Sequence, residues 1–517
     1  MSHILLALEA LLFLASAWCL GEALLKALRP SFSPLRRFLV AMLLGLGLWS
    51  FIGAALGAAG LFDATVLQFI LIAALAGSWR TLRAAAVELW QQRAFGGLFQ
   101  RHPAFKAMLL LWFLVGFVIV FMPVTGFDAK RYHVPIVHDL IENERFAFSE
   151  DIVNYAYLPL GAEALYAVPT ALFGNLSAPY LFQLLQFAVF WVLLLFVYDF
   201  VRDKVRVPWL AFLAPLLLLS LMDLEREVYH GGYIDVIMFT FAVTSFLVLL
   251  DHAARGGGLR SPAVAVSAIL LGTALSMKYL AIPFAAFNGT LLLLFLWRER
   301  TAWRRAAVLL AVYVGIVLLV AGFWYGKNFI AFGNPVYPMF HVEELAHELG
   351  AIGWWVADRT LANLSVFPFL RYGQWFYDDT QSSSHLVTFA SFFALYALLA
   401  FFLLRRLHLS LTEVALFAAG HGYLWLLFFL SHQHRYLLGG VILLATLLIL
   451  LFDRFYAHAL RGAGEALRHR FDKAAIASST LVFLVLFGGF VHYFQYKFWY
   501  VAGRDTKEEY ILNIGGL

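Results

Sequence analysis

Long, uninterrupted runs of apolar residues dominate this chain. In Phe187–Val197 and Leu424–Leu430 every residue is apolar, whereas strands of membrane barrels alternate between apolar and polar positions. A helix needs about 20 mostly apolar residues to cross a bilayer. This criterion predicts an all-α, polytopic membrane bundle of about 14 helices, or 12 if short neighbours merge. The predicted spans cover residues 3–25, 38–60, 61–78, 107–124, 179–201, 207–222, 234–251, 262–280, 283–297, 306–325, 387–404, 413–430, 436–452 and 474–492.

Composition agrees with this prediction and excludes several classes of protein. Of the 517 residues, 62% are hydrophobic and only 13% are charged, and the mean hydropathy is +0.80. A soluble domain is about one quarter charged, so this chain has too few charges to cover a water-facing surface. A soluble enzyme, a disordered chain and a nucleic-acid-binding protein are therefore excluded. The single cysteine, Cys19, excludes a disulfide framework and a thiolate metal site.

Basic residues predict how the chain is oriented in the membrane. Most of the 37 Lys and Arg residues lie in alternate loops, and such an excess is typical of cytoplasmic loops. With these loops inside, both termini are expected outside. The two long segments 125–178 and 326–386 then fall on the non-cytoplasmic face, where long loops commonly carry function.

The same pattern divides the chain into four regions. Residues 1–106 hold N-terminal transmembrane helices and a basic cytoplasmic segment, and 107–325 form a transmembrane core that includes the outer loop 125–178. Residues 326–386 are predicted to form a second outer loop. Residues 387–517 contain the last transmembrane helices and an outer tail.

The first outer loop begins with several chemically active side chains. Asp128, Lys130, Arg131, Tyr132 and His133 follow a predicted span within six residues. One interpretation is an anchor at the lipid headgroups, where Arg, Lys and Tyr are common. The other is a carboxylate, Asp128, that accepts a proton from a substrate at the membrane surface, as a general base must within hydrogen-bond reach.

Three further charges lie at the ends of predicted spans. Lys278 and Arg435 are expected near the outer ends, where a cation either extends to the headgroups or binds the phosphate of a lipid. A charge within a span is costly and therefore normally has a partner or a functional role. Asp235 starts a span, which is also the usual position of a helix-capping Asp.

Six short motifs resemble the GT-C superfamily of membrane glycosyltransferases, in particular protein O-mannosyltransferases and the lipid A aminoarabinose and galacturonic acid transferases. The first has the form D-x-x-x-Y-H-x-P and follows the fourth predicted span, whereas in the family this loop usually follows the first. The motifs are Phe127–Pro135, Tyr155–Gly161, Tyr233–Asp235, Leu271–Tyr279, Gly333–Pro338 and His434–Leu438.

The resemblance implies a GT-C-like fold with helices in its outer loops, and a role for each matching residue. Asp128 and Asp235 would be catalytic, with a divalent cation (Mg or Mn) held between them as an alternative to metal-free chemistry. Lys278, Arg435, Arg131 and Lys327 would bind the phosphate of the donor. The expected substrate-binding residues are Tyr132, His133, Tyr157, Tyr233, Asn334, Tyr337, His434 and Tyr436.

The function implied is transfer of a sugar from a polyprenyl-phosphate donor to a lipid, glycan or protein acceptor, with inversion at the anomeric carbon. The expected location is a bacterial inner membrane, with the site facing the periplasm. Two alternatives remain at this stage. One is a transporter or flippase of lipid-linked sugars, which would bind its substrate near the bilayer centre. The other is a polymerase or ligase that joins whole glycan chains, as O-antigen enzymes do.

The second outer loop also contains metal-binding residue types. Glu343 and His347 are four residues apart, as neighbours on one helix face would be, and a zinc or calcium site is one interpretation. An amphipathic helix lying on the membrane is the other. The loop as a whole is a candidate lid over the substrate.

Overall fold

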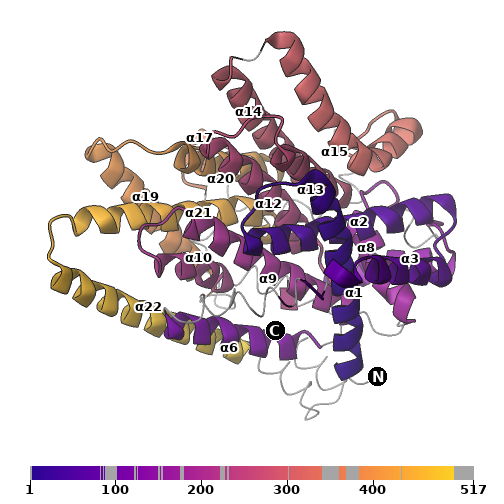
Figure 1. Cartoon of the computed structure of the whole chain (residues 1–517), viewed down its shortest axis with the longest axis horizontal. Helices are drawn as coiled ribbons and strands as arrows, with labels where there is room; N and C mark the ends of the chain where they lie inside the picture. Colours follow the sequence, from indigo (N-terminus) through magenta and orange to yellow (C-terminus); the bar gives the residue numbers. More distant parts are fainter. Residues whose placement is uncertain are drawn as a thin grey trace. The chain divides into compact units, whose positions relative to one another are not determined.

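The computed structural model of the chain contains only helices as regular elements in the residues it describes (Figure 1). These residues are 3–81, 83–84, 87, 102–121, 124, 126–148, 152, 155–174, 180–221, 228–229, 232–300, 302–339, 360–367, 369, 384–431 and 433–493. The described residues thus confirm the prediction of an all-α chain with helices that are apolar enough to span a bilayer.

Within the described ranges, ten helices are long and apolar enough to cross a membrane. They are α1 (His3–Leu28), α2 (Pro34–Ala59), α9 (Tyr180–Arg202), α12 (Asp235–Ala254), α14 (Ile282–Arg298, extended at its start by η3, Tyr279–Ala281), α15 (Trp303–Phe332), α19 (Ser384–Leu404), α20 (Leu411–Leu430), α21 (His434–Ala459) and α22 (Glu465–Tyr493). Four shorter apolar helices are α3 (Ala64–Gly77), α6 (Pro103–Ile119), α10 (Leu210–Leu219) and α13 (Pro262–Met277).

Each predicted span overlaps one of these helices, and two of the differences in their boundaries concern the candidate site residues. Helix α15 continues to Phe332, so Lys327 lies on a helix and not in the outer loop. Helix α13 ends at Met277, and Lys278 is extended (φ −163°, ψ 144°). The prediction placed this break three residues later, between the spans 262–280 and 283–297.

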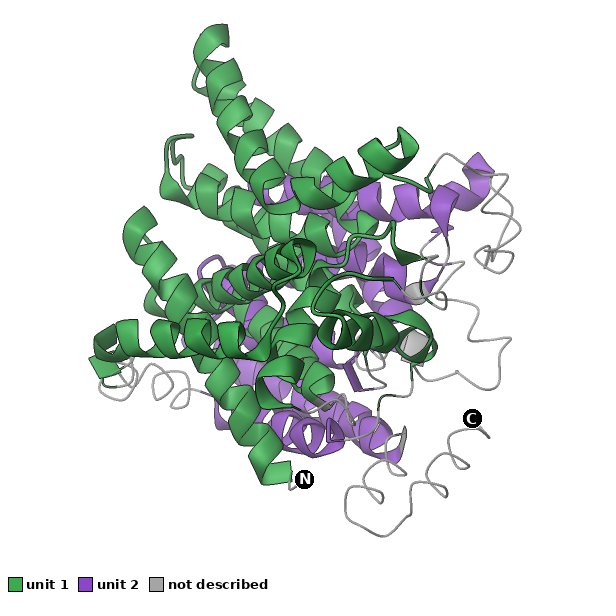
Figure 2. Ribbon diagram, turned by 90° about the vertical axis from the view of Figure 1, so that its right-hand side faces the viewer, with its two compact units in different colours: residues 1–90, 123–196, 230–354 green, residues 91–122, 197–229, 355–517 purple. Residues whose placement is uncertain are grey.

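The chain forms two compact units (Figure 2). Unit 1 consists of residues 1–90, 123–196 and 230–354, and unit 2 of residues 91–122, 197–229 and 355–517. Helix α9 belongs to unit 1 up to residue 196 and to unit 2 from residue 197. All motifs except His434–Leu438 lie in unit 1.

In unit 1, α1 and α2 approach each other through small residues. A Cβ atom added to Gly21 would meet the carbonyl oxygen of Ala41, and one added to Gly45 would meet that of Ala17. Such small residues allow two helix backbones to pack closely in a membrane, where no hydrophobic effect drives helices together. The backbones of α1 and α2 are therefore in direct van der Waals contact at these glycines.

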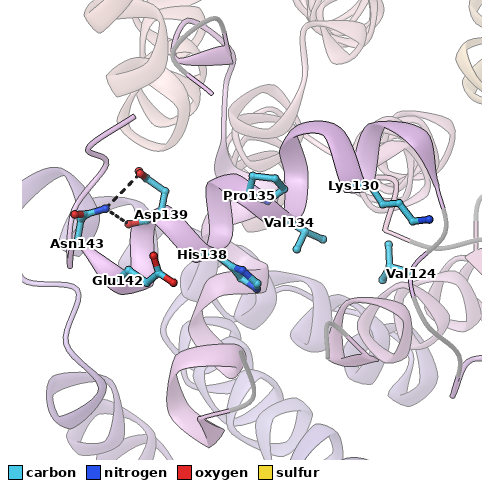
Figure 3. A pocket seen from close by; sticks show the side chains of 8 residues that line it. All are labelled: Val124, Lys130, Val134, Pro135, His138, Asp139, Glu142 and Asn143. Carbon is cyan, nitrogen blue, oxygen red and sulfur yellow. Dashed lines mark hydrogen bonds between the residues drawn. The ribbon is translucent and has the colours of Figure 1, made fainter. Parts of the chain in front are cut away.

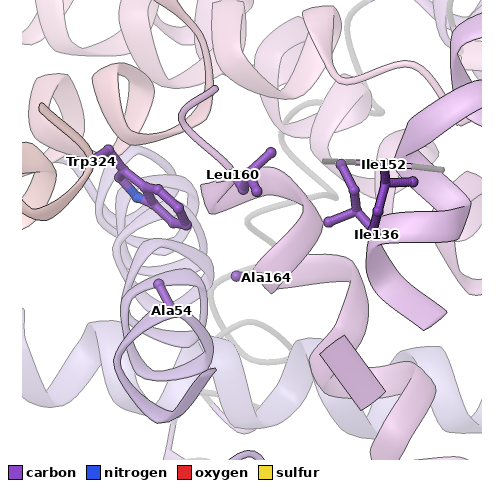
Figure 4. Packing of buried hydrophobic residues seen from close by; sticks show 6 residues of the cluster. All are labelled: Ala54, Ile136, Ile152, Leu160, Ala164 and Trp324. Atoms are coloured by element: carbon purple, nitrogen blue, oxygen red, sulfur yellow. The ribbon is translucent and has the colours of Figure 1, made fainter. Parts of the chain in front are cut away.

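A second packing centre of unit 1 lies beneath the first outer segment (Figure 4). Helices α7 (Val134–Glu142) and α8 (Gly161–Phe173) pack against each other and α8 packs on α2. Their buried side chains form one hydrophobic cluster: Ala54, Ile136, Ile152, Leu160, Ala164 and Trp324. The cluster thus fixes the inner face of α7 and leaves its other face available.

Helix α12 carries a buried carboxylate at each end. Asp251, near its end, pairs with Arg36 at the start of α2 (2.5 Å) and with Arg255 (3.0 Å). Asp235, in its first turn, pairs with Lys278 at 2.7 Å. Sixteen residues of helix separate the two carboxylates by about 24 Å, which approaches the thickness of a bilayer core.

In unit 2, α21 is the central helix and packs against α10, α19 and α20. Helix α6 packs on α22, with Trp112 in contact with Phe487 at a ring distance of 5.2 Å. Asp453 of α21 accepts hydrogen bonds from the backbone N–H groups of Arg206 and Val207. These bonds attach the turn before α10 to the end of α21.

Replacing Gly45 with Ala is expected to destabilise the protein by about 1–3 kcal/mol, because the added methyl group overpacks the α1–α2 contact. Equilibrium unfolding in mixed micelles measures this change. Gly315→Ala is the matched control, since a Cβ there has no neighbouring atom within 4 Å. Equal stability of the two variants would contradict the close α1–α2 packing.

Candidate active site

The segment 126–148 contains a short π-helix, η1 (Ala129–His133), which directly follows Asp128. The wide π turn is rare and is frequently found at functional sites. Asp128 is half-buried, whereas Lys130 and Arg131 are exposed. The carboxylate therefore lies at the boundary between protein and surroundings, as a group that must meet a substrate does.

The start of this segment is fixed by the Tyr233 region. The backbone N–H of Phe127 donates to the Tyr233 hydroxyl at 3.2 Å. Gly232 has φ +88°, and a Cβ there would lie 2.6 Å from the Cβ of Ala129 and 2.8 Å from Val124. Both the positive φ and the close approach require glycine. The residues on either side of Asp128 are thus in contact with the segment that leads into α12.

The end of the π-helix is fixed by a buried pair. His133 Nδ1 lies 2.6 Å from Glu163 Oε1 on α8, and each side chain is only 1% exposed. The second oxygen of Glu163 is buried without a hydrogen-bond partner among the described residues. His133, expected to bind substrate, instead connects η1 to α8, so the segment that carries Asp128 is attached at both ends.

Lys278 and Asp235 form the central ion pair of the site. Their 2.7 Å contact joins the break after α13 to the first turn of α12, and the side chains are 19% and 1% exposed, respectively. Asp235 makes no capping bond at the start of α12, so the helix-capping interpretation is not supported. Its Oδ2 is buried and has no partner in the described part of the chain.

Beside this pair, a hydrogen-bonded group joins three of the motifs. The Tyr279 hydroxyl donates to the carbonyls of Tyr157 (3.0 Å) and Tyr337 (2.9 Å). Asn328 Nδ2 donates to the Tyr157 carbonyl and to the Tyr279 hydroxyl. The Tyr157 and Tyr337 rings meet edge to face, with their centroids 5.4 Å apart. Residues distant in sequence therefore form one polar cluster.

Two of the expected ligand-binding residues have structural contacts. Asn334 accepts from the N–H of Val336 and donates to the carbonyl of Met339, and so stabilises the turn that contains the cis Tyr337–Pro338 bond. Lys327 donates to the carbonyl of Ala156. Its ammonium also lies 5.0 Å from the centre of the Trp324 ring, a cation–π distance. Both residues support the site.

Tyr132 provides an aromatic surface beside Asp128. Its ring stacks on that of Tyr155, with centroids 4.3 Å apart and planes inclined by 16°. Both rings are half-buried. The two first-loop motifs are thus joined by this stack.

The last motif lies in unit 2. The Arg435 guanidinium contacts Gln433 (3.2 Å) and the hydroxyl of Tyr436 (3.2 Å), above whose ring it also lies. Helix α21 begins at His434, and the side chain of His434 is outside the described residues. The segment with Glu343 and His347 also lies outside them.

The residues expected to bind a metal do not match a cation site. In the described residues, no three His, Cys, Asp or Glu side chains gather as ligands. Asp235 has an ammonium group at hydrogen-bond distance, which is the wrong neighbour for a divalent cation because like charges repel.

A pocket of about 560 Å³ lies along the outward face of η1 and α7 (Figure 3). Its polar lining includes Lys130, His138, Asp139, Glu142 and Asn143. The residues at 130, 134, 138 and 142 recur every fourth position, as one face of a helix does.

Sequence reasoning missed Glu163 and Asn328, as well as this pocket. Glu163 follows Gly161 in the second motif by two residues, and a carboxylate in an otherwise apolar helix is a signal of function. Asn328 had no comparable signal, because a single amide near a predicted loop is common. The pocket residues lie just beyond the first motif, in a segment that has an apolar face of its own.

Comparisons with known protein families, with curated proteins and with solved structures gave no match for this chain.

Removing one partner of the ion pair is expected to destabilise the protein asymmetrically. Lys278→Met leaves the buried Asp235 carboxylate unpaired, which costs about 3–5 kcal/mol. Asp235→Asn costs less, because the partly exposed Lys278 can extend toward polar headgroups. The free energy of unfolding in mixed micelles is measured for both single variants and for the double variant. The double variant should be more stable than Lys278→Met alone. If the loss in the double variant equalled the sum of the two single losses, the pair would contribute nothing to stability, which would contradict this interpretation.

Proposed function

We propose that the protein is a membrane glycosyltransferase that transfers a sugar from a polyprenyl-phosphate donor to an acceptor hydroxyl on the non-cytoplasmic face. The observation that carries the proposal is the arrangement around Tyr233. Its hydroxyl accepts a bond from the residue before Asp128, and Asp235, two residues after it, pairs with Lys278. A candidate base and a candidate phosphate-binding cation are thus connected through one short segment.

The reaction is a single displacement. The acceptor oxygen forms a bond to the anomeric carbon, and its proton passes to the Asp128 carboxylate. The bond between the anomeric carbon and the phosphate oxygen breaks, its electron pair stays on that oxygen, and the configuration inverts. The polyprenyl phosphate leaves with one more negative charge, which the Lys278 ammonium stabilises.

The Lys278–Asp235 pair suits this role electrostatically. An ammonium has three N–H donors, so Lys278 can remain bonded to Asp235 and still donate to a phosphate oxygen. Asp235 keeps the cation at the break between α13 and η3. Arg131, exposed on η1, is a second candidate cation for the same phosphate.

The two ends of α12 support the proposed orientation. Asp251 binds arginines of two predicted cytoplasmic loops, whereas Asp235 belongs to the opposite end with the candidate site. A cytoplasmic excess of Arg is the usual membrane pattern. These contacts support the proposal of a site on the non-cytoplasmic face, which in a bacterial inner membrane is the periplasmic face.

Asp128→Asn is expected to lower kcat at least about 100-fold, because the amide cannot accept the proton. The Michaelis constant for the donor should change by less than about twofold, since the phosphate contacts remain. Both constants are measured with purified protein, radiolabelled polyprenyl-phosphate sugars as donors and cell-envelope acceptors. Glu144→Gln, an exposed change on the segment after α7, is the control. Full activity of Asp128→Asn would exclude Asp128 as the base.

The same assay separates the proposal from its alternatives. Transfer of a single sugar supports it. Transfer of a preassembled glycan would identify a polymerase or ligase, and movement of the lipid-linked sugar across a vesicle membrane without bond formation would identify a transporter.

Single-cysteine labelling tests the orientation. Cys19 is buried, so a new cysteine is the main reactive thiol. Arg145→Cys, on the exposed segment after α7, should react with a membrane-impermeant maleimide added outside spheroplasts. Arg300→Cys, in the loop between α14 and α15, should react only after lysis. The reverse pattern would overturn the orientation.

A further inference from the structure

We infer that the pocket on the outward face of η1 and α7 binds the acceptor as a hydroxyl-rich carbohydrate. This inference rests on the proposed function and names a substrate class for it. The pocket lies on the helical segment that begins directly after Asp128 (Figure 3). A general base acts on the acceptor, so the acceptor must bind beside it.

The charges of the lining exclude the donor phosphate as the main ligand. The lining contains two carboxylates, Asp139 and Glu142, one ammonium, Lys130, and one imidazole, His138. A phosphate would be repelled by the carboxylates. A sugar presents hydroxyl groups that donate to carboxylates and accept from ammonium or amide groups, so this mixed lining suits a neutral or amino sugar.

Part of the wall is held in place by hydrogen bonds. Asp139 is buried, and its two oxygens accept from Asn143 Nδ2 (3.3 Å) and from the N–H of Phe148 (2.9 Å). These bonds fix the end of α7. Binding residues held by such bonds lose little conformational entropy when a ligand binds.

Three other side chains are available to a ligand. Among the described residues, the side chains of Lys130, His138 and Glu142 make no hydrogen bond or ion pair, and they occupy one face of the segment. Val134 and Pro135 lie between them on the pocket wall. Apolar groups flanked by polar ones match the apolar C–H face and polar hydroxyl edge of a sugar ring, and the volume lies in the range of small-molecule sites.

The inner face of the same helix explains why the pocket has a fixed shape. Ile136, Val137 and Leu140 are buried, and Ile136 belongs to the cluster with Leu160 and Trp324 (Figure 4). Since one face of α7 is anchored in the core, the opposite face presents its polar residues at fixed positions.

Transfer kinetics test this inference with the full-length protein. His138→Ala and Glu142→Gln should each raise the Michaelis constant for the acceptor about tenfold, because each removes a hydrogen bond with a potentially charged group. The constant for the donor and kcat at saturating acceptor should stay within about twofold. Glu144→Gln, outside the pocket, is the matched control. A rise in the Michaelis constant for the donor alone, or no change in the Michaelis constant for either substrate, would overturn the inference.

Binding to a glycan array separates this inference from the proposed function. The purified protein should retain neutral or amino mono- and disaccharides, and His138→Ala and Glu142→Gln should lose them. Pocket-dependent binding without transfer from any donor would support the pocket and refute the glycosyltransferase. Transfer combined with retention of phosphorylated sugars only would support the enzyme and overturn the carbohydrate pocket.

Discussion

The ion pair between Lys278 and Asp235 is the interaction on which the arrangement of unit 1 depends. A charge in a membrane span is tolerated only with a partner or an aqueous path. Lys278 meets this condition because α13 ends one residue before it and because Asp235 starts α12 beside it. The same pair fixes the relation of α12, α13 and α14, and it keeps a cation at the end of the helices, where a lipid phosphate can approach.

The segment next to this pair also helps to fix the position of Asp128, the residue that is proposed to act as the base. Tyr233 and Gly232, just before Asp235, contact the residues around Asp128, while His133 and Glu163 attach the far end of η1 to α8. Asp128 therefore lies directly before the five residues of η1, in a segment that is held at both ends. A catalytic carboxylate needs such positioning, since displacement by about 1 Å can lower a rate 100-fold.

Much of the helical architecture was predictable, because a membrane span must satisfy its own backbone hydrogen bonds and so appears as a long apolar run. The pairing of Lys278 with Asp235 was not, because the two residues are 43 positions apart in the chain and their contact is tertiary. The tethering role of His133 was equally hidden, because its contact with Glu163 is tertiary. Sequence patterns identified the candidate residues. Asn334 and Lys327 nevertheless make structural contacts, and sequence alone cannot distinguish a residue with such a role from one that binds a ligand.

The scarcity of charge explains why the remaining polar residues are informative. In a chain that is only 13% charged, the buried carboxylates Asp235, Asp251 and Glu163 each have a basic partner within 3 Å, as burial of a charge requires. The exposed polar face of α7 is under no such requirement, because water or headgroups solvate it. The side chains of Lys130, His138 and Glu142 are therefore not needed for folding in the way the buried pairs are, and their collection into one pocket on the segment after Asp128 is better explained by a ligand than by stability.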